Sequence, residues 1–451
     1  MTVLSIEHQM RRAESLIQKG RVDDAKSLYE ELLKKFPKNQ KAQKRLANLI
    51  RKKEEIQSST EVERYNQLLI SLHFEGRFEE MLDISKKATQ ENPNSILGWF
   101  YYGAAHRALG NSEAALSAFK RVIEINPTFS DGHTNLGAVF QDRNEFGIAI
   151  ECYKTAICLK DNNAKAFNNL GTAYKAKGDL KNSIEAYKKA ISIEPQFAVA
   201  HKNLGSALKD VGLNSEAKRA YKVALSLRPN DEEIEYMIAC LVGEKLQTAP
   251  RRYVEKLFDG YATRFEQALV GQLDYKIPEL ISQLFNKEKG DELVESVLDL
   301  GCGTGLVGEK IRNKCKRLEG IDLSQNMVEL AARKQVYDKV VKADIAEYLA
   351  STELDFDCFI AADVFVYLGD LAEVFCQIKS KNKRGGMLFF STEHNEKEGF
   401  FLETSGRFSH SKSYVESLCV EFGYAISSFS KTRLRKEKET FLEGGLYILE
   451  F

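Results

Sequence analysis

The sequence has 451 residues with 65 basic and 65 acidic side chains, so its formal net charge is zero. This balance argues against bulk nucleic acid or an anionic membrane surface as the main partner, and no apolar run reaches the roughly 18 residues that a membrane span needs. Residues 1–20 are too polar for a secretory signal, and the eight cysteines are scattered without metal-ligand spacing. We therefore expect a cytoplasmic protein of two domains, with reduced thiols and no bound metal.

The N-terminal half repeats with a period of 34 residues. Glycines and aromatic residues keep this spacing at Gly103, Gly137, Gly171, Gly205, Phe119, Tyr153, Tyr187 and Tyr221. A fixed period of this length, with prolines near the ends of the units, predicts paired helices stacked as a solenoid. The pattern resembles the tetratricopeptide repeat family. It implies about six units with a terminal capping helix over residues 1–242, interrupted at residues 51–63 by an extra helical segment or a polar insertion.

Three asparagines, Asn135, Asn169 and Asn203, each lie two residues before a repeat glycine. In the resembling family this position lines the concave face, and a side-chain amide can both donate and accept a hydrogen bond. Two interpretations stay open. The column holds an extended peptide or protein in the repeat groove, or it is a solvated polar column copied by repeat duplication.

A short polar stretch with Pro250, residues 243–252, is the predicted linker between the domains. Residues 253–265 follow with apolar and aromatic side chains at helical spacing. These aromatic residues either belong to a core or close over a ligand.

From Ser296 onward, short apolar strands alternate with helical segments. The predicted strands cover residues 297–300, 318–322, 340–342, 356–362, 387–391, 425–429 and 447–451. This alternation predicts an α/β, doubly wound, Rossmann-like domain over residues 253–451, with a mostly parallel seven-stranded sheet. The last two strands are too close for a crossover helix, so we expect an antiparallel pair at one end of the sheet.

The first predicted strand ends in Asp299 and passes into three alternate glycines, Gly301, Gly303 and Gly305, which let a ligand approach the backbone amides. Ligands of such sheets bind beyond the carboxyl ends of the strands. Asp322 ends the second strand, where a carboxylate can accept hydrogen bonds from both ribose hydroxyls.

Two cofactors fit the glycine loop. Residues 303–308 match the dinucleotide pattern G-x-G-x-x-G, which is a weak signal by itself. Asp299 suits a ligand with an ammonium group, and Asp344 after the third strand suits an adenine amino group. A ligand with ammonium, ribose and adenine is S-adenosylmethionine, so we favour it over a nicotinamide cofactor.

Residues 297–305, 320–327, 343–344 and 356–357 resemble the ordered motifs of class I S-adenosylmethionine-dependent methyltransferases. The resemblance covers residues 250–451, and residues 258–262 resemble the helical lid of small-molecule methyltransferases. The whole arrangement is similar to repeat-bearing predicted methyltransferases of bacterial type. The resemblance implies cofactor contacts from Asp299, Gly301, Cys302, Gly303, Gly305, Asp322, Leu323, Met327, Asp344, Ile345, Ala361 and Tyr261.

The methyl acceptor cannot be read from these motifs. The fourth strand lacks the Asn/Asp-Pro-Pro-Tyr signature of enzymes that methylate adenine or glutamine nitrogens, which disfavours those acceptors. Side chains expected to border the acceptor pocket are Asp363, Tyr367, Glu393, His394 and His410. His394, Tyr367 and Asp363 are the catalytic candidates, but capping, packing and surface roles explain them equally well. Arg407 either binds an acidic acceptor or forms a salt bridge.

The leading hypothesis is a methyltransferase that acts on a small-molecule, carrier-bound or protein acceptor, with the repeat array recruiting a peptide or protein partner. The alternative is an interaction scaffold whose methyltransferase-like domain binds the cofactor but is catalytically idle.

Overall fold

The computed structural model describes residues 3–262, 265–266, 275–351, 353–437 and 440–451. The chain divides into two compact units, Met1–Pro195 and Gln196–Phe451, and each is considered by itself. No helix in these described ranges is long and apolar enough to cross a membrane.

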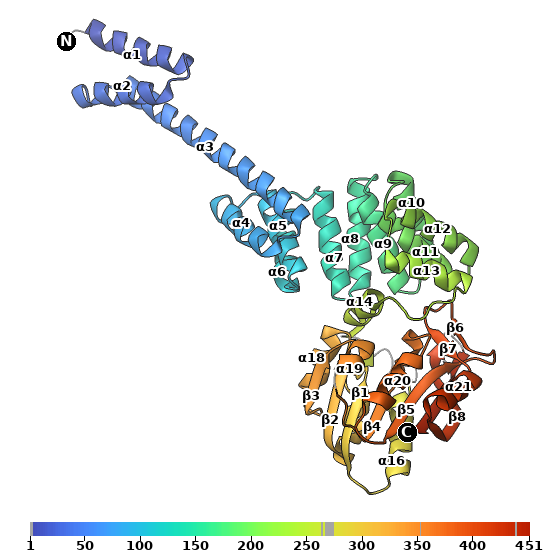
Figure 1. Ribbon diagram of the computed structural model, residues 1–451. Coiled ribbons are helices and arrows are strands. Elements are labelled where there is room, and N and C mark those ends of the chain that lie inside the picture. Colours follow the sequence, from blue (N-terminus) through green and yellow to red (C-terminus); the bar gives the residue numbers. More distant parts are fainter. Residues whose placement is uncertain (1–2, 263–264, 267–274, 352, 438–439) are drawn as a thin grey trace. The chain divides into compact units, whose positions relative to one another are not determined.

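The described part of the first unit is helical throughout (Figure 1). Its helices are α1 (Val3–Gln18), α2 (Val22–Lys35), α3 (Gln40–Glu75), α4 (Phe78–Glu91), α5 (Ile96–Ala108), α6 (Ser112–Ile125), α7 (Ser130–Asp142), α8 (Phe146–Leu159), α9 (Ala164–Ala176) and α10 (Leu180–Ile193). The predicted interruption at residues 51–63 is not a break, because α3 continues through it as one helix of 36 residues. No Gly or Pro lies within α3, so nothing in its backbone chemistry ends the helix earlier.

The period of 34 residues follows from one contact inside each helical pair. A Cβ atom added to Gly137 of α7 would lie 2.7 Å from the ring of Tyr153 of α8, and Gly171 meets Tyr187 at the same distance. Real Cβ atoms do not approach other atoms so closely, so the glycine lets a buried aromatic ring pack against the helix backbone. This contact explains why the glycine and the aromatic residue recur together.

The second unit begins with three further helices, α11 (Ala198–Asp210), α12 (Asn214–Leu227) and α13 (Glu232–Val242). They continue the repeat pattern, since Gly205 of α11 meets Tyr221 of α12 in the same way. α14 (Arg251–Tyr261) and α16 (Ile277–Lys289) then lead into a nine-stranded sheet.

Seven strands of this sheet follow the order β3-β2-β1-β4-β5-β9-β8. Their bounds are β1 (Val294–Leu300), β2 (Cys315–Asp322), β3 (Lys339–Lys342), β4 (Cys358–Ala361), β5 (Met387–His394), β8 (Ala425–Glu437) and β9 (Thr440–Glu450). The first five are parallel, and β9 runs antiparallel to both β5 and β8. The predicted α/β fold with a terminal antiparallel pair is therefore confirmed.

Two features exceed the predicted seven strands. A short hairpin of β6 (Phe400–Leu402) and β7 (Phe408–His410) adds to the end of β5, and strands of three residues are too short to show a periodicity. β8 and β9 are also much longer than predicted. Residues 431–437 are rich in charge, so the apolar pattern that marks a strand fades there.

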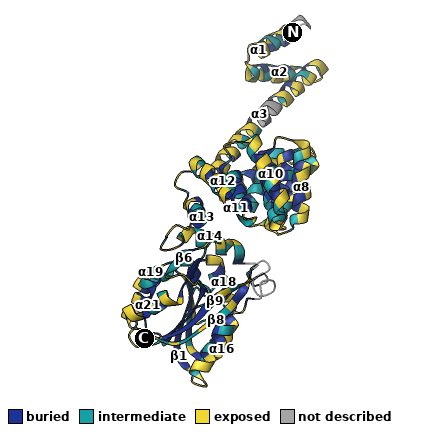
Figure 2. Cartoon of the chain, turned by 90° about the vertical axis from the view of Figure 1, so that its right-hand side faces the viewer, coloured by how far each residue is buried: buried dark blue, intermediate teal, exposed yellow. Residues whose placement is uncertain are grey.

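Helices cover both faces of the sheet. On one face, α19 (Ile345–Ser351), α20 (Ala372–Lys381) and α21 (Lys412–Phe422) share a core with Phe359 and Phe390; on the other, α16 and α17 (Leu306–Ile311) share one with Ile360 and Phe389. Neighbouring residues of one strand therefore enter opposite cores, as the pleat requires. The strands are accordingly buried while the outer helix faces are exposed (Figure 2).

Candidate functional site

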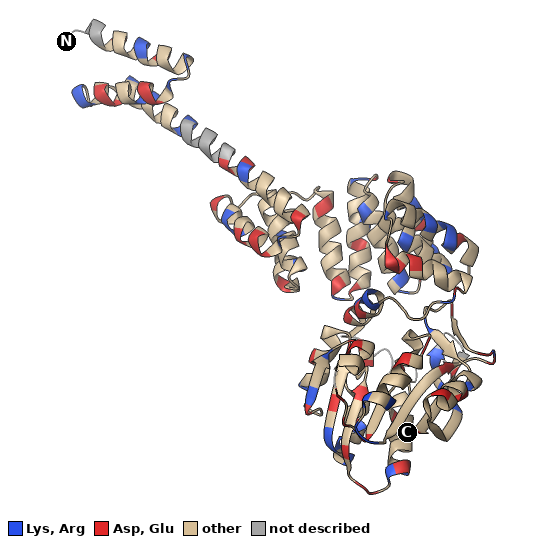
Figure 3. Ribbon diagram, in the orientation of Figure 1, with Lys and Arg blue, Asp and Glu red and all other residues tan. Residues whose placement is uncertain are grey.

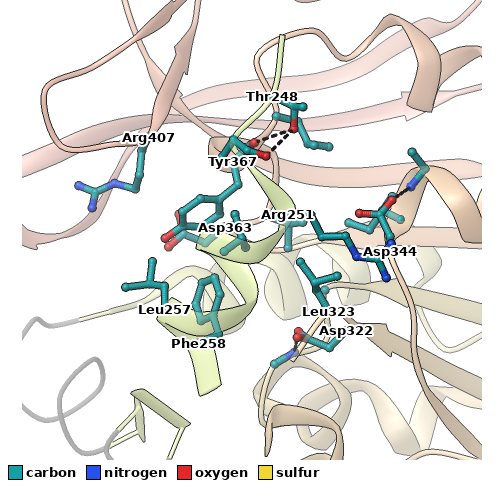
Figure 4. Close-up of a pocket in the computed structure, with 18 of the residues that line it drawn as sticks. Thr248, Arg251, Leu257, Phe258, Asp322, Leu323, Asp344, Asp363, Tyr367 and Arg407 are labelled. Atoms are coloured by element: carbon teal, nitrogen blue, oxygen red, sulfur yellow. Dashed lines mark hydrogen bonds between the residues drawn. The ribbon is translucent and has the colours of Figure 1, made fainter. Parts of the chain in front are cut away.

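A cavity of about 1000 Å³ opens at the carboxyl ends of the parallel strands in the second unit. Its walls are the glycine loop, the ends of β2 and β4, helix α14 and the segment 247–251. Figure 4 shows Asp322, Leu323 and Asp344 at one side of this space and Asp363, Tyr367 and Arg407 at the other, with Leu257 and Phe258 of α14 nearby. The cavity thus has two halves.

The first half is built by the glycine loop and the end of β2. Gly301 and Gly303 line the cavity with positive φ angles of 67° and 55°, a region that favours glycine. The amide of Gly303 donates to Oδ2 of Asp322 at 2.9 Å, and the amide of Ser324 donates to Oδ1 at 2.8 Å. These bonds fix the carboxylate at the cavity wall, and each oxygen keeps a second lone pair for a ligand hydroxyl.

Asp322 has an altered acidity. Burial raises its pKa from 3.8 to about 6, although the backbone amides of Ser324 and Gly303 lower it by stabilising the charge. The carboxylate is therefore ionised at neutral pH and becomes protonated in mildly acidic solution.

Leu323, Asp344 and Ile345 complete this half. Oδ1 of Asp344 accepts from the amides of Ala346 at 2.9 Å and Glu347 at 3.2 Å, which caps the start of α19. The cap orients the carboxylate toward the cavity edge, where the sequence places an adenine contact.

Asp299 is placed differently from the other predicted contacts. It is almost fully buried, its Oδ2 accepts a hydrogen bond of 2.7 Å from the hydroxyl of Tyr337, and it does not line the cavity. Burial raises the pKa of Asp299 to about 7. Cys302, Gly305, Met327 and Ala361 also lie off the cavity wall, so direct cofactor contacts by these five residues stay predictions.

Helix α14 closes the cavity over this half. Val254, Leu257, Phe258 and Tyr261 line it from one helix face, as the predicted lid requires. Asp259 holds the helix down, because its Oδ1 accepts from the Ser324 hydroxyl at 2.5 Å and from the Asn326 amide at 3.2 Å.

Two ion pairs fix the same helix along its length. Arg251 pairs with Glu347 of α19 at 2.7 Å, and Glu255 pairs with Lys342 of β3 at 2.6 Å. Together with Asp259, they hold the helix against the strand ends at three points.

The predicted linker contributes to the cavity wall. The carbonyl of Gln247 accepts from the amides of Gly369 and Asp370 at 2.8 and 2.9 Å, and the amide of Ala249 donates to the carbonyl of Tyr367 at 3.0 Å. Gln247 and Thr248 line the cavity. Part of the segment 243–252 is therefore fixed to the domain that follows it.

The second half of the cavity is dominated by a charged cluster. Arg435 of β8 donates from Nη1 to Oδ2 of Asp363 and from Nη2 to Oε1 of Glu393, both at 2.6 Å. Arg407 donates from Nε to the same Oε1. Arg407 therefore forms a salt bridge, which was one of its two predicted roles. Arg435, which the sequence analysis did not single out, lies at the centre of the charged cluster.

Asp363 and Tyr367 line this half, but Glu393 and the two predicted histidines do not. His410 is fully buried, its Nε2 lies 2.9 Å from the carbonyl of Gly369, and burial lowers its pKa to about 4. His394 lies beside Phe429 and 3.6 Å from Glu396. A role for either histidine in this cavity is not supported by its position.

The asparagine column lies outside this cavity. Asn135 is buried, and its amide donates to the carbonyl of Asp131 within α7 at 2.9 Å. Asn169 accepts from Asn168 at 3.3 Å, and Asn203 is half-buried on α11. Peptide binding by this column stays a prediction.

Comparisons with known proteins agree with the two halves of the chain. Residues 298–390 match a family described as a methyltransferase domain. Four segments match tetratricopeptide repeat families: residues 7–49, 96–129, 140–178 and 164–197.

Two relatives are methyltransferases. A malonyl-[acyl-carrier protein] O-methyltransferase of Priestia megaterium is 31% identical over 161 residues, which cover 35% of this chain and 53% of the relative. A ubiquinone biosynthesis O-methyltransferase of Thiobacillus denitrificans is 29% identical over 118 residues, covering 25% of this chain and 50% of the relative. The chain thus spans about half the length of these curated relatives.

Solved structures are similar to either half. A tetratricopeptide repeat protein of Thermus thermophilus has 20% identity and a TM-score of 0.37, covering 40% of this chain and 98% of its own. Magnesium protoporphyrin IX methyltransferase of Synechocystis PCC 6803 has 16% identity and a TM-score of 0.35, covering 44% and 98%.

Proposed function

We propose that this chain, which joins tetratricopeptide repeats to an S-adenosylmethionine-dependent methyltransferase domain, transfers a methyl group to an acceptor bound in the second half of the cavity. The repeat array recruits the protein that is, or that carries, this acceptor. The observation that supports the proposal best is that Gly301, Gly303, Asp322, Leu323 and Asp344 border one cavity with space beyond them.

The residues present fit the cofactor. A Cβ atom at Gly303 would enter the gap toward Phe265, whose ring is 3.9 Å away, so glycine keeps the space between loop and lid open. Asp322 offers two fixed oxygens to the ribose hydroxyls, while Asp344 and Ile345 border the expected adenine position. The bound cofactor supplies an electrophilic methyl group.

This chain's own residues bind the two reactants, orient them and exclude water from the site. In-line alignment of two bound reactants accounts for about 7–11 kcal/mol of rate enhancement in well-oriented systems. α14 is the element that closes the site, because its apolar face covers the cavity and Asp259, Arg251 and Glu255 fix it to the strand ends. The methyl group does not need to be attached covalently to the enzyme during its transfer.

A role for the array in acceptor delivery is supported by α13, the helix that ends it. The Tyr236 hydroxyl donates to the carbonyl of Gly406 at 3.1 Å, next to Arg407. Glu233 pairs with Lys256 of α14 at 3.4 Å, and Glu232 lines the cavity. Helix α13, which ends the array, therefore borders the site.

The cofactor assignment is tested by thermal unfolding of the full chain with S-adenosylmethionine or its demethylated product. A ligand that binds only the folded state at 100 times its Kd stabilises by about 2.7 kcal/mol, which raises Tm by several degrees. Asp322→Asn should reduce the shift, whereas Asp83→Asn on the exposed face of α4 should not. Absence of any shift with either compound would refute cofactor binding.

Methyl transfer and recruitment need a second experiment. Cell extract incubated with the protein and cofactor labelled in the methyl group should yield a labelled product, and a catalytically idle scaffold would yield none. Removal of residues 1–195 should lower labelling of a protein acceptor in extract while the Tm shift persists. If the truncated chain loses the Tm shift as well, the full chain with Asn135→Ala and Asn169→Ala replaces it.

A further inference from the structure

The charges around the second half of the cavity restrict the acceptor, on the premise that the proposed methyl transfer is correct. In the part of the chain that the structure describes, three guanidinium groups line the cavity, those of Arg251, Arg407 and Arg435. An anionic acceptor would need at least one of them.

Each of these cations already has a carboxylate. Arg251 pairs with Glu347, Arg407 with Glu393, and Arg435 with both Asp363 and Glu393. The side chains of Arg435 and Glu393 are only 7% and 4% exposed. Separating a buried pair costs about 3–5 kcal/mol, because it leaves an uncompensated charge. A carboxylate acceptor that bound Arg407 or Arg435 would have to meet this cost, whereas the Arg251–Glu347 pair is 47% and 69% exposed and costs little to open.

Carboxylates outnumber the cations on the walls. Among the described residues six line the cavity: Asp322 and Asp344 in the first half, Asp363 paired with Arg435, and Glu232, Asp370 and Glu373. Glu232, Asp370 and Glu373 are exposed, and both acidic and basic residues occur along the helices and strands of this domain (Figure 3). A cleft lined mainly by one sign of charge concentrates ligands of the other sign.

Aromatic rings border the same space. Phe258 of α14 contacts Tyr367 edge-to-face with ring centroids 5.3 Å apart, and Phe258 and Phe265 are 6.2 Å apart. Tyr261 and Tyr275 also line the cavity. Faces of aromatic rings attract ammonium groups, by about 2 kcal/mol or more in desolvated sites.

Asp363 has one carboxylate oxygen without a hydrogen-bond partner among the described residues. It follows β4 with a φ angle of 60°, and its amide donates to the Ser391 hydroxyl at 2.8 Å. Such a conformation costs free energy and persists only where the surroundings fix it. Oδ2 is bonded to Arg435, whereas Oδ1 is buried and has no hydrogen-bond partner among the described residues. This oxygen therefore keeps an unsatisfied negative charge close behind the cavity wall.

From these contacts we infer that the methyl acceptor is an amine, which enters as an ammonium ion between the aromatic rings and the carboxylates. It loses one proton to water. The nitrogen lone pair of the neutral amine then forms the new C–N bond while the C–S bond breaks and its electron pair stays on sulfur. The positive charge passes from the sulfonium to the methylated ammonium.

Three probes that differ mainly in their polar group test this inference: benzylamine, benzyl alcohol and benzoate. Binding to the full chain, saturated with demethylated cofactor, is measured by ligand-detected NMR. Benzylamine should bind at least five times more tightly than benzyl alcohol, and benzoate should bind most weakly. Equal or tighter binding of benzoate or benzyl alcohol would overturn the inference, as would failure of benzylamine to bind.

Variants locate the effect. Glu232→Gln with Glu373→Gln removes two exposed wall carboxylates and should weaken benzylamine binding about threefold, while Glu235→Gln, exposed on α13 but off the wall, should not. Equal effects of both variants would overturn the inference. Asp363→Asn should remove the preference for benzylamine over benzyl alcohol; if it unfolds, the Glu232 and Glu373 result decides.

The outcome separates two failures. If the demethylated cofactor produces no Tm shift, the proposed function fails. If it does, and the amine preference is absent, only the acceptor class is wrong.

Discussion

The two halves of the cavity are built by different means. We call the first half the cofactor half and the second half the acceptor half, after the ligands proposed for them. The cofactor half uses backbone amides and carboxylates at consecutive strand ends, such as Gly303 with Asp322 and Ala346 with Asp344. The acceptor half uses side-chain pairs between distant segments, such as Arg435 with Asp363, which are 72 residues apart. The first kind of construction tolerates changes around it, whereas the second depends on every member being present.

The largest effect should follow loss of the central cation in the acceptor half. Arg435→Leu leaves Asp363 and Glu393 as buried carboxylates without this partner, so the free energy of unfolding should fall by about 3–5 kcal/mol in denaturant titrations. Arg433→Leu, exposed on the same strand, is the control and should cost far less. Similar losses for both variants would show that the buried cluster does not stabilise this half.

A smaller effect should follow a change in the cofactor half. Asp322→Asn removes the charge that accepts ribose hydrogen bonds, so affinity for the demethylated cofactor should fall by about 1.5–3 kcal/mol, or roughly 10- to 150-fold. Calorimetry measures this change. The asparagine side chain keeps one acceptor oxygen for the two amides of Gly303 and Ser324, so the free energy of unfolding should fall by about 1–3 kcal/mol, partly offset by removal of the buried charge; a larger loss would indicate a mainly structural role.

The two carboxylates of raised pKa give opposite pH trends for stability and binding. Asp322 and Asp299 hold protons more tightly when folded, with pKa values of about 6 and 7 against 3.8. Their contribution to stability is therefore present below pH 4 and is lost as pH rises through 6 and 7. Cofactor affinity should instead fall as pH drops below 6, up to tenfold per unit, and Asp322→Asn should flatten this profile. An affinity that does not change between pH 5 and 8 would contradict the assignment.

The smallest effect should come from the contact between α13 and the β6–β7 turn. Tyr236→Phe removes the hydrogen bond to Gly406, worth about 1 kcal/mol of unfolding free energy, and should weaken benzylamine binding while cofactor affinity stays the same. Tyr29→Phe removes a buried hydroxyl that has no partner in the described structure, so it is the matched control. Equal losses of cofactor and benzylamine affinity would show that Tyr236 does not act on the acceptor half alone.

The sequence brings several residues of the cofactor half together because their geometry is local, although five of the predicted contacts lie off the cavity wall and all cofactor contacts stay predictions. Strand alternation places Asp322 and Asp344 at neighbouring strand ends, and both line the cavity. Asp299 shows the limit of this reasoning. One of its oxygens accepts a hydrogen bond from a tyrosine hydroxyl 38 residues away. No periodicity in the sequence predicts such a partner.

Much of the acceptor half was not predicted, because it too depends on contacts between residues that are distant in the sequence. Arg435 lies on a strand whose predicted end came too early, and Gln247 lies in the stretch expected to be only a linker. The histidines looked promising by their place after a strand end, yet the pleat directs His394 away from the side that holds Glu393. Side-chain direction and long-range pairing decide this half.

The contact of glycine with tyrosine inside each helical pair has a consequence for how such an array changes in length. Gly137 meets Tyr153 and Gly171 meets Tyr187 without help from another pair. Each helical pair is therefore a unit with its own glycine–tyrosine contact. Duplication or loss of 34 residues leaves this contact intact in every remaining pair. An insertion of one or two residues between the glycine and its tyrosine would instead rotate the ring out of its notch, so the array accepts changes in number far more readily than changes in phase.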